Sequence, residues 1–234
     1  MKRTLVILTY NEIEALPRVF DRIPKDSAHE VFAVDGGSHD GTRQFLEARR
    51  LRVFGQERRG RGEAFRVAMR NAAGEGVVFF SPDGNEDPGD IPGLFDLLDA
   101  GADMAVASRM AAGAFNEEDV SWWRPRKWGN MAFGLAANTA FNRGPYVTDT
   151  INGFRGVRRS AFERLAPDAD GFVIEFQMTM RAMKLGLHVA ELPTREGQRL
   201  GGHSTASSLP TGLVFLRALY LELRGKAPAP GAAI

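Results

Sequence analysis

The sequence predicts an α/β protein built on a mostly parallel β-sheet with helices on both faces. Four short apolar runs recur in the first half of the chain, and each is followed by a polar or glycine-bearing loop and a helix-like segment. Uninterrupted apolar runs of this length are typical of parallel strands that are covered on both faces. Strands that alternate with helices favour a doubly wound sheet. The runs comprise residues 4–8, 31–34, 77–80 and 104–107.

The spacing of apolar residues predicts the helices in order along the chain. One stripe covers residues 13–23, and a second covers 64–72 and ends at Gly74, which we expect to be its C-cap. Prolines mark residues 226–234 as a disordered tail. The remaining predicted helices cover residues 129–140, 160–165, 175–185 and, as a last amphipathic helix, 209–225.

The composition excludes several classes of protein. The 234 residues include 30 Lys plus Arg against 29 Asp plus Glu, which argues against nucleic acid as the main partner because phosphate-tracking surfaces need a basic excess. The absence of cysteine excludes disulfide bonds, thiol catalysis and cysteine-bound zinc. The apolar stretch 213–223 is interrupted by Arg217 and Glu222 and is shorter than the about 20 residues that span a bilayer. We therefore expect a soluble protein, or one attached to a membrane surface.

Polar residues follow each of the four apolar runs at once. Because ligands of open parallel sheets bind beyond the carboxyl ends of the strands, these polar clusters are expected to meet in one site. The loop after the first run contains no glycine, so it is not a dinucleotide-binding G-x-G-x-x-G loop, and the chain has no P-loop motif. A bound nucleotide would therefore be held by carboxylates and a metal. The clusters are residues 9–12, 35–42, 81–88 and 108–109.

Six motifs, which appear in the same order, give the chain a resemblance to family 2 glycosyltransferases of the GT-A fold. The nearest branch is the dolichol- or polyprenyl-phosphate mannosyl- and glucosyltransferases, and the resemblance covers roughly residues 2–205. It implies a catalytic domain at 1–208, with a nucleotide-sugar half at 1–110 and an acceptor half at 111–208. The motifs are Thr9-Tyr10-Asn11-Glu12, Asp35 with Ser38–Thr42, Arg59–Ala64, Asp83 with Asp87-Pro88, Ser108-Arg109, and Asp149 with Asn152–Arg155; Arg199 with Gly202-His203-Ser204 extends the match.

The resemblance implies which residues hold the nucleotide. Glu12 would accept hydrogen bonds from the ribose and Asp35 from a base N–H, although Asp35 also suits a turn carboxylate. Tyr10 would lie against the base or pack at the rim of the site. The arginines and glycines of residues 58–62 precede a helix and would face a phosphate or form a solvated basic loop. The implied nucleotide-binding set is Thr9, Tyr10, Glu12, Asp35, Gly37, Arg61, Ser81 and Arg109.

The metal-binding signature of the family is altered in this chain. Ser81-Pro82-Asp83 stands where Asp-x-Asp is usual, so the second carboxylate remains and the first is a serine. Asp83 and Asn85 would bind Mg²⁺ or Mn²⁺ through oxygen, and an alternative register makes Asp83-Gly84-Asn85 the signature. His203 is a further candidate ligand. Pro82–Asn85 is also a strong turn signal, and the lost carboxylate leaves a non-catalytic nucleotide-sugar-binding homologue open.

The reaction implied by the resemblance is inverting, in-line transfer of a sugar from a nucleoside-diphosphate donor. Where relatives that use a hydroxyl acceptor carry Glu-Asp, this chain has Glu175-Phe176. A phosphate acceptor is already ionised and needs no general base, so the sequence favours a polyprenyl phosphate over a glycan hydroxyl. Arg199 lies in a segment that resembles the loop which closes over the pyrophosphate. The implied catalytic residues are Asp83, Arg199, Glu175 and Asp149.

Two questions stay open at this level. Glu175 equally suits a helix first-turn carboxylate. The last helix would pack on the core, form a homodimer, or lie on a membrane near a lipid acceptor. We therefore expect a cytoplasmic protein or one peripheral to the inner face of the membrane.

A nucleotidyltransferase on a similar fold is an alternative function. It would need a glycine- and lysine-rich loop after the first strand, and residues 9–12 argue against it.

Overall fold

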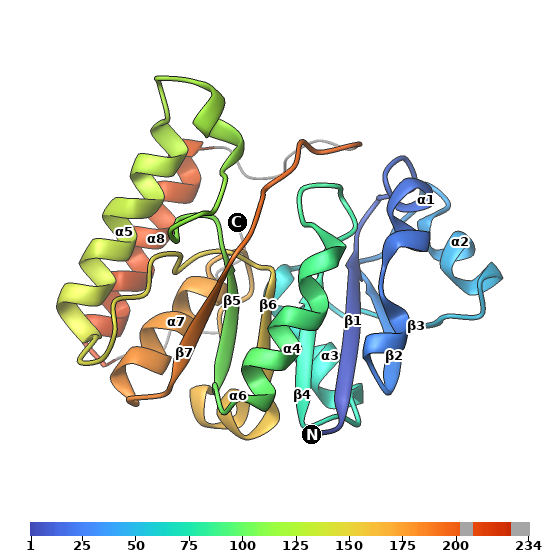
Figure 1. Ribbon diagram of the computed structural model, residues 1–234, viewed down its shortest axis with the longest axis horizontal. Coiled ribbons are helices and arrows are strands. Elements are labelled where there is room, and N and C mark those ends of the chain that lie inside the picture. Colours follow the sequence, from blue (N-terminus) through green and yellow to red (C-terminus); the bar gives the residue numbers. More distant parts are fainter. Residues whose placement is uncertain (202–207, 226–234) are drawn as a thin grey trace.

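The computed structural model describes residues 1–201 and 208–225, which form one twisted seven-stranded sheet with helices on both faces (Figure 1). The strand order is β3-β2-β1-β4-β6-β5-β7, and only β6 is antiparallel to its neighbours β4 and β5. The predicted mostly parallel α/β architecture is therefore confirmed. The strands are β1 Arg3–Thr9, β2 Glu30–Asp35, β3 Arg52–Gly55, β4 Gly76–Phe80, β5 Met104–Ser108, β6 Arg155–Arg158 and β7 Val189–Pro193.

The strands are apolar on both sides because helices cover both faces of the sheet. Leu5 and Ile7 pack with α1, α2 and α4, whereas Val6 and Leu8 point the other way and pack with α3, α6 and α7. The helices are α1 Leu16–Val19, α2 Thr42–Ala48, α3 Arg61–Asn71, α4 Ile91–Asp99, α5 Pro125–Phe141, α6 Arg159–Leu165, α7 Ile174–Lys184 and α8 Ser208–Leu223.

Two predicted helix boundaries are wrong. The stripe over 13–23 forms only the short α1 and a 3-10 turn, because Ile23 is extended ahead of Pro24. Gly74 is not a C-cap: α3 already ends at an extended Ala72. The N–H of Gly74 donates instead to Thr4 Oγ1 at 2.9 Å, in a place where a side chain would collide with the start of β1.

The sequence did not predict the strands β3, β6 and β7, and each omission has a physical reason. The edge strands β3 and β7 mix polar and apolar residues because they are only partly buried. The central strand β6 contains two arginines and a glycine, so its sequence has no apolar run. The side chain of Arg155 in β6 is fully buried, and its guanidinium donates hydrogen bonds to other protein groups, including the backbone oxygens of Asn152 and Glu175.

The last helix lies beside α5 at one end of the molecule, and both pack on α7 (Figure 1). Phe215 and Ala218 of α8 are buried in this third apolar cluster, so the core-packing alternative for the last helix is confirmed. No helix within the described ranges is long and apolar enough to cross a membrane. Residues 226–234 lie outside the described part, and their disorder stays a prediction.

Candidate active site

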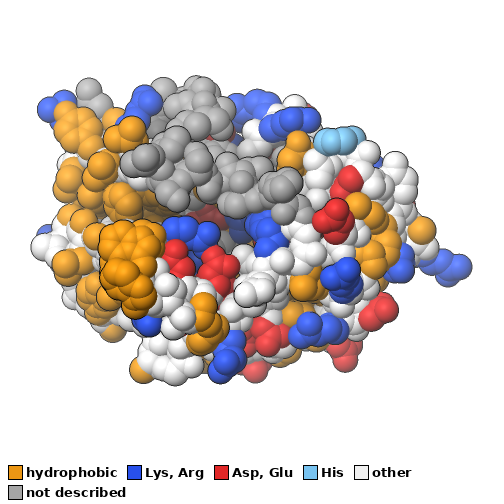
Figure 2. Space-filling model, turned by 90° about the horizontal axis from the view of Figure 1, so that it is seen from above, with side chains coloured by type: hydrophobic (Ala, Val, Ile, Leu, Met, Phe, Trp, Pro, Cys, Tyr) orange, Lys and Arg blue, Asp and Glu red, His pale blue; other side chains and the backbone are white. Residues whose placement is uncertain are grey.

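A cavity of about 600 Å³ opens at the carboxyl ends of the central strands. Seen from above, acidic and basic side chains meet in the hollow at the centre of this face (Figure 2). Its walls come from the loop after β4, the first turns of α3 and α7, the start of α5, and the segment after β7. The convergence of polar clusters that the parallel strands predict is therefore found for the loops after β4 and β5. The predicted site residues that line the cavity are Arg61, Ser81, Asp83, Asn85, Arg109, Glu175 and Arg199.

None of the described residues in the loops after β1 and β2 lines this cavity, and the two loops are tied together by Asp35. Its buried carboxylate accepts hydrogen bonds from Thr9 Oγ1 at 3.2 Å, from the backbone N–H groups of Gly37 and Ser38 at 3.0 and 2.9 Å, and from Ser38 Oγ at 2.5 Å. With these contacts Asp35 acts as a turn carboxylate, which is the alternative role that the sequence allows for it. Gly37 has a φ of +89°, which suits glycine in this turn. Contacts of Thr9, Asp35 and Gly37 with a base stay a prediction.

Glu12 links the first loop to the cavity electrostatically. Burial, and then the negative charge of Asp83, raise the pKa of Glu12 to about 7, while Arg199 opposes the shift. The Oε2 atom of Glu12 is buried and has no hydrogen-bond partner among the described residues. Tyr10 is 38% exposed, and the guanidinium of Arg59 lies 5.4 Å from its ring centre. Whether Tyr10 contacts a base or packs at the rim stays open.

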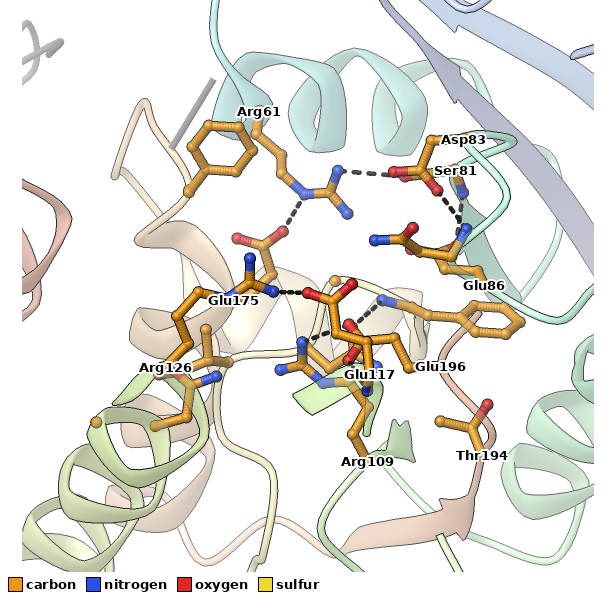
Figure 3. Close-up of a pocket in the computed structure, with 18 of the residues that line it drawn as sticks. Arg61, Ser81, Asp83, Glu86, Arg109, Glu117, Arg126, Glu175, Thr194 and Glu196 are labelled. Carbon is orange, nitrogen blue, oxygen red and sulfur yellow. Dashed lines mark hydrogen bonds and ion pairs between the residues drawn. The ribbon is translucent and has the colours of Figure 1, made fainter. Parts of the chain in front are cut away.

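The loop after β4 places Asp83 next to Ser81 on one wall of the cavity (Figure 3). One carboxylate oxygen of Asp83 pairs with Arg199 at 2.7 Å, and the other accepts the backbone N–H of Asn85 at 3.0 Å. Ser81 Oγ accepts a hydrogen bond from Arg61 at 3.2 Å. The loop thus forms the polar turn that the sequence predicts, and it also contributes candidate site residues to the cavity.

A buried ion pair joins the first turns of α3 and α7. Arg61 pairs with Glu175, which is 2% exposed, and the Oε2 atom of that glutamate has no partner in the described part of the chain. Sequence reasoning missed Glu86, which also lines the cavity and whose Oε2 accepts the N–H of Ser81 at 2.7 Å. Burial, and then the charge of Asp83, raise the pKa of Glu86 to about 8. The sequence feature that could have identified Glu86 as a site residue is its position inside the polar cluster 81–88.

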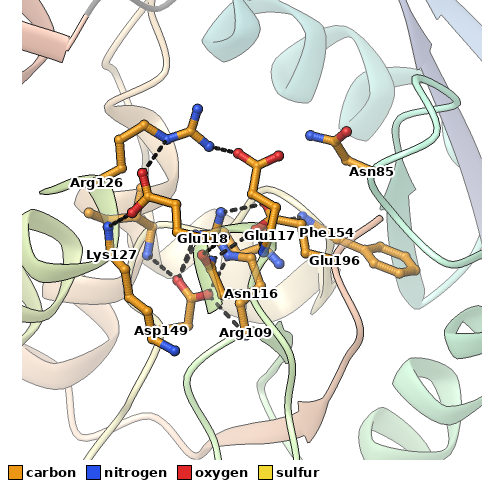
Figure 4. A network of polar contacts seen from close by, with 12 residues as sticks. Asn85, Arg109, Asn116, Glu117, Glu118, Arg126, Lys127, Asp149, Phe154 and Glu196 are labelled. Carbon is orange, nitrogen blue, oxygen red and sulfur yellow. Dashed lines mark hydrogen bonds and ion pairs between the residues drawn. The ribbon is translucent and has the colours of Figure 1, made fainter. Parts of the chain in front are cut away.

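A second ion-pair network fixes Arg109 (Figure 4). Arg109 donates to Asp149 at 2.8 Å and to Glu196 at 3.1 Å, and Asn116 donates to the same Glu196 at 2.9 Å. Asp149 is 2% exposed and lies behind Arg109, outside the lining of the cavity. Although burial opposes it, the charge and hydrogen bonds of Arg109 hold the pKa of Asp149 below its usual range. These are the contacts of a residue that positions Arg109, and a catalytic role for Asp149 stays a prediction.

The donor atoms around Asp83 fit a hard divalent cation. Asn85 Oδ1 is buried and has no hydrogen-bond partner within the described residues, and it lies in the same turn as the Asp83 carboxylate. Carboxylate and amide oxygens are ligands that Mg²⁺ and Mn²⁺ accept, and these ions take further ligands from phosphates and water. No group of three His, Asp or Glu residues in 1–201 and 208–225 forms a ready-made metal cluster. The candidate ligand His203 lies outside the described residues.

The glycine-bearing start of α3 packs against protein. The N–H of Gly62 donates to the backbone oxygen of Asp170 at 2.8 Å, and a Cβ on Gly62 would overlap the backbone oxygen of Ala169. We therefore expect Gly62→Ala to lower the free energy of unfolding by about 1–3 kcal/mol, measured by urea denaturation. Gly129, a helical glycine with open space at its Cβ position, is the matched control, and Gly129→Ala should be neutral or stabilising. Equal effects of the two changes would contradict this interpretation.

Comparisons with known proteins agree with the fold and identify the family. The family described as "Glycosyl transferase family 2" matches residues 4–166. Polyprenol monophosphomannose synthase of Mycolicibacterium smegmatis is 32% identical, over 96% of this chain and 89% of that protein. Undecaprenyl-phosphate mannosyltransferase of Micrococcus luteus is 28% identical, over 88% of each. The crystal structure of glucosyl-3-phosphoglycerate synthase from Mycobacterium tuberculosis with Mn²⁺ and UDP-glucose superimposes with a TM-score of 0.71 at 24% identity, covering all of this chain and 82% of that one. The chain therefore belongs to glycosyl transferase family 2, as its motifs predict, and is a glycosyltransferase of the GT-A fold.

Proposed function

We propose that the protein transfers a sugar from a nucleoside-diphosphate donor to a polyprenyl phosphate, with inversion at the anomeric carbon and with Mg²⁺ or Mn²⁺ bound. The observation that carries the proposal is the cavity at the strand ends, where Asp83, Arg199 and an Asn85 oxygen without a partner among the described residues lie together. Two relatives, one named as a synthase of polyprenol monophosphomannose and the other as an undecaprenyl-phosphate mannosyltransferase, support this acceptor class.

In this proposal the side chains of the cavity stabilise the departing nucleoside diphosphate. Asp83 and Asn85 would hold the cation, which, when bound, supplies positive charge to the diphosphate. Arg199 lies against Asp83 and would add a second positive charge as the sugar–phosphate bond breaks. Arg109 lines the opposite wall, held by Asp149 and Glu196, so that little reorganisation would be needed to meet an anionic ligand.

The pairing of Glu175 supports a phosphate acceptor. One oxygen of its carboxylate is already engaged by the guanidinium of Arg61, so Glu175 is poorly placed to serve as a general base. An acceptor phosphate is itself ionised near neutral pH and would attack without a general base. The alternative, a hydroxyl acceptor of a glycan, rests on one observation: Glu175 lines the cavity, and its second oxygen has no partner in the described chain. In that alternative this oxygen would take the hydroxyl proton.

An exposed apolar surface next to the cavity supports a lipid acceptor. The helix α5 contributes cavity residues such as Phe133, and the same helix exposes Trp128, Met131 and Leu135 to solvent. Seen from above, hydrophobic side chains gather on the side of the molecule formed by α5 and α8 (Figure 2). Large apolar and aromatic side chains of this kind insert into the boundary of a bilayer. The exposed members are Val120, Trp122, Trp123, Trp128, Met131, Leu135, Leu213, Leu216, Tyr220 and Leu223.

This surface is expected to bind membranes. The double change Trp122→Ser with Trp123→Ser should weaken partition onto vesicles of phosphatidylcholine and phosphatidylglycerol at least about tenfold, because burial of one large apolar side chain is worth about 1.5–3 kcal/mol. Leu185→Ser, which alters an exposed apolar residue ahead of the amino end of β7, is the control and should leave partition unchanged. Equal partition of both variants, with a loss of dimer in the tryptophan variant, would favour the homodimer alternative.

Thermal unfolding with UDP, GDP, CDP and dTDP, each with and without Mn²⁺, tests the donor site. Ligand binding to the folded state stabilises it by about 2.7 kcal/mol when the ligand is at a hundred times its Kd. One nucleotide should raise the Tm in a metal-dependent manner, and Asp83→Ala should remove the increase. If no nucleotide changes the Tm of the wild-type protein, the donor-site assignment is wrong.

A further inference from the structure

The loop after β4 folds back on itself and brings Glu86 to the position of the altered metal signature. The Oε2 atom of Glu86 lies 2.7 Å from the backbone nitrogen of Ser81, the residue that stands where the first carboxylate of Asp-x-Asp is usual. Both side chains line the cavity, together with Asp83 (Figure 3). A carboxylate is thus present beside residue 81, although it comes from five residues further along the chain.

Carboxyl groups outnumber guanidiniums around Ser81. Asp83, Glu86 and Glu175 bring three carboxyl groups to this part of the cavity, and Arg61 and Arg199 bring two guanidiniums. Buried ions need partners, because desolvation without them is costly. A divalent cation next to Asp83 and Glu86 would balance both the carboxylates and the diphosphate.

A second and independent observation also indicates a ligand. Glu175 lines the cavity and is 2% exposed, and its buried Oε2 atom has no hydrogen-bond partner among the residues the structure describes. Asn85 Oδ1, in the same loop as Glu86, is likewise buried and unpartnered. Buried polar atoms are nearly always satisfied in proteins, so oxygens left unpaired around one cavity point to a group that binds there.

We propose that Glu86 supplies the carboxylate that Ser81 lacks and binds the divalent cation together with Asp83. This inference rests on the proposed function and concerns the same site. The hydrogen bond to the N–H of Ser81 leaves acceptor positions of Glu86 free for a cation, since a carboxylate that binds a cation has about four of them. Arg61, which donates to Ser81 Oγ, then lies between the Glu86 and Glu175 carboxylates as their shared counter-charge.

The test measures the affinity for Mn²⁺ alone, by the electron paramagnetic resonance signal of the free ion, in four proteins. They are the wild type, Glu86→Gln, Ser81→Asp with Glu86→Gln, and Asp87→Asn. The amide oxygen of Glu86→Gln can still accept the Ser81 N–H, so the loop is retained. Asp87→Asn is the matched control, because Asp87 is the adjacent acidic residue and is exposed.

We expect Glu86→Gln to weaken Mn²⁺ binding at least about tenfold, the lower end of what altering a residue around a metal costs. Ser81→Asp should restore the affinity of the Glu86→Gln protein to within about threefold of the wild type, and Asp87→Asn should leave it unchanged. Unaltered Mn²⁺ affinity in Glu86→Gln overturns the inference. A loss that Ser81→Asp does not restore, accompanied by a lower Tm without metal, also overturns it, because Glu86 then acts only on the loop.

A parallel calorimetric titration with GDP and UDP at saturating Mn²⁺ separates this inference from the proposed function. If the wild type binds Mn²⁺ in a Glu86-dependent manner but binds neither nucleotide, the donor proposal fails and the assignment of Glu86 stands. If the wild type binds neither Mn²⁺ nor a nucleotide, both are overturned.

Discussion

Replacing Asp83 with Asn is expected to slow sugar transfer by about 10²–10³-fold, the loss typical of removing one group that stabilises charge in a transition state. Asp83 is the carboxylate on which the proposed cation and Arg199 both depend. The change conserves size and keeps an oxygen that can accept the Asn85 N–H, so the fold should survive. The release of nucleoside diphosphate is measured with Mn²⁺, a short-chain polyprenyl phosphate, and GDP-mannose or UDP-glucose.

The control for this experiment is Asp87→Asn. Asp87 lies in the same loop, but it is exposed and caps the short 3-10 helix Pro88–Asp90 through the N–H of Gly89. Its replacement should change the rate less than about threefold, because it removes no group from the cavity lining. If both aspartates prove equally dispensable for transfer, Asp83 is not at the reacting centre.

Replacing Asp149 with Ala is expected to lower the free energy of unfolding by about 3–5 kcal/mol. The change removes the buried partner of Arg109 and leaves a largely enclosed guanidinium without its main counter-charge, which is among the costliest single changes in a protein interior. It also removes an acceptor for the backbone N–H of Asn152. Urea denaturation followed by circular dichroism measures the effect.

Glu47→Ala is the matched control, because Glu47 also pairs with an arginine, Arg43, but on the surface of α2. Exposed pairs of this i,i+4 kind contribute about 0.3–0.5 kcal/mol, so the control should stay close to the wild type. The experiment also decides between two roles for Asp149. A variant that folds as stably as the wild type but transfers no sugar would restore the catalytic role predicted from the motif.

The sequence by itself determined the architecture of residues 1–110. Strands β1, β2, β4 and β5 can be recognised in the sequence as continuous apolar runs, because a strand that is covered on both faces must be apolar on both. The polar residues that follow them had to meet at one edge, because parallel strands share the edge at which they end. Asp83 could therefore be placed in the site without coordinates, and so could the family, from motifs that lie close together in the chain.

Only the tertiary structure decided how the charged residues of the site are paired. Arg61 and Glu175 are 114 residues apart, and Arg109 and Asp149 are 40 apart, so no local spacing reveals either pair. The fold-back of the 81–88 loop, which sets Glu86 beside residue 81, is equally invisible in a list of residues. Local periodicity and turn-forming residues determine the strands and loops. The partner of a buried charge depends instead on how distant elements pack, because only the neighbours that packing supplies offset the cost of removing the charge from water.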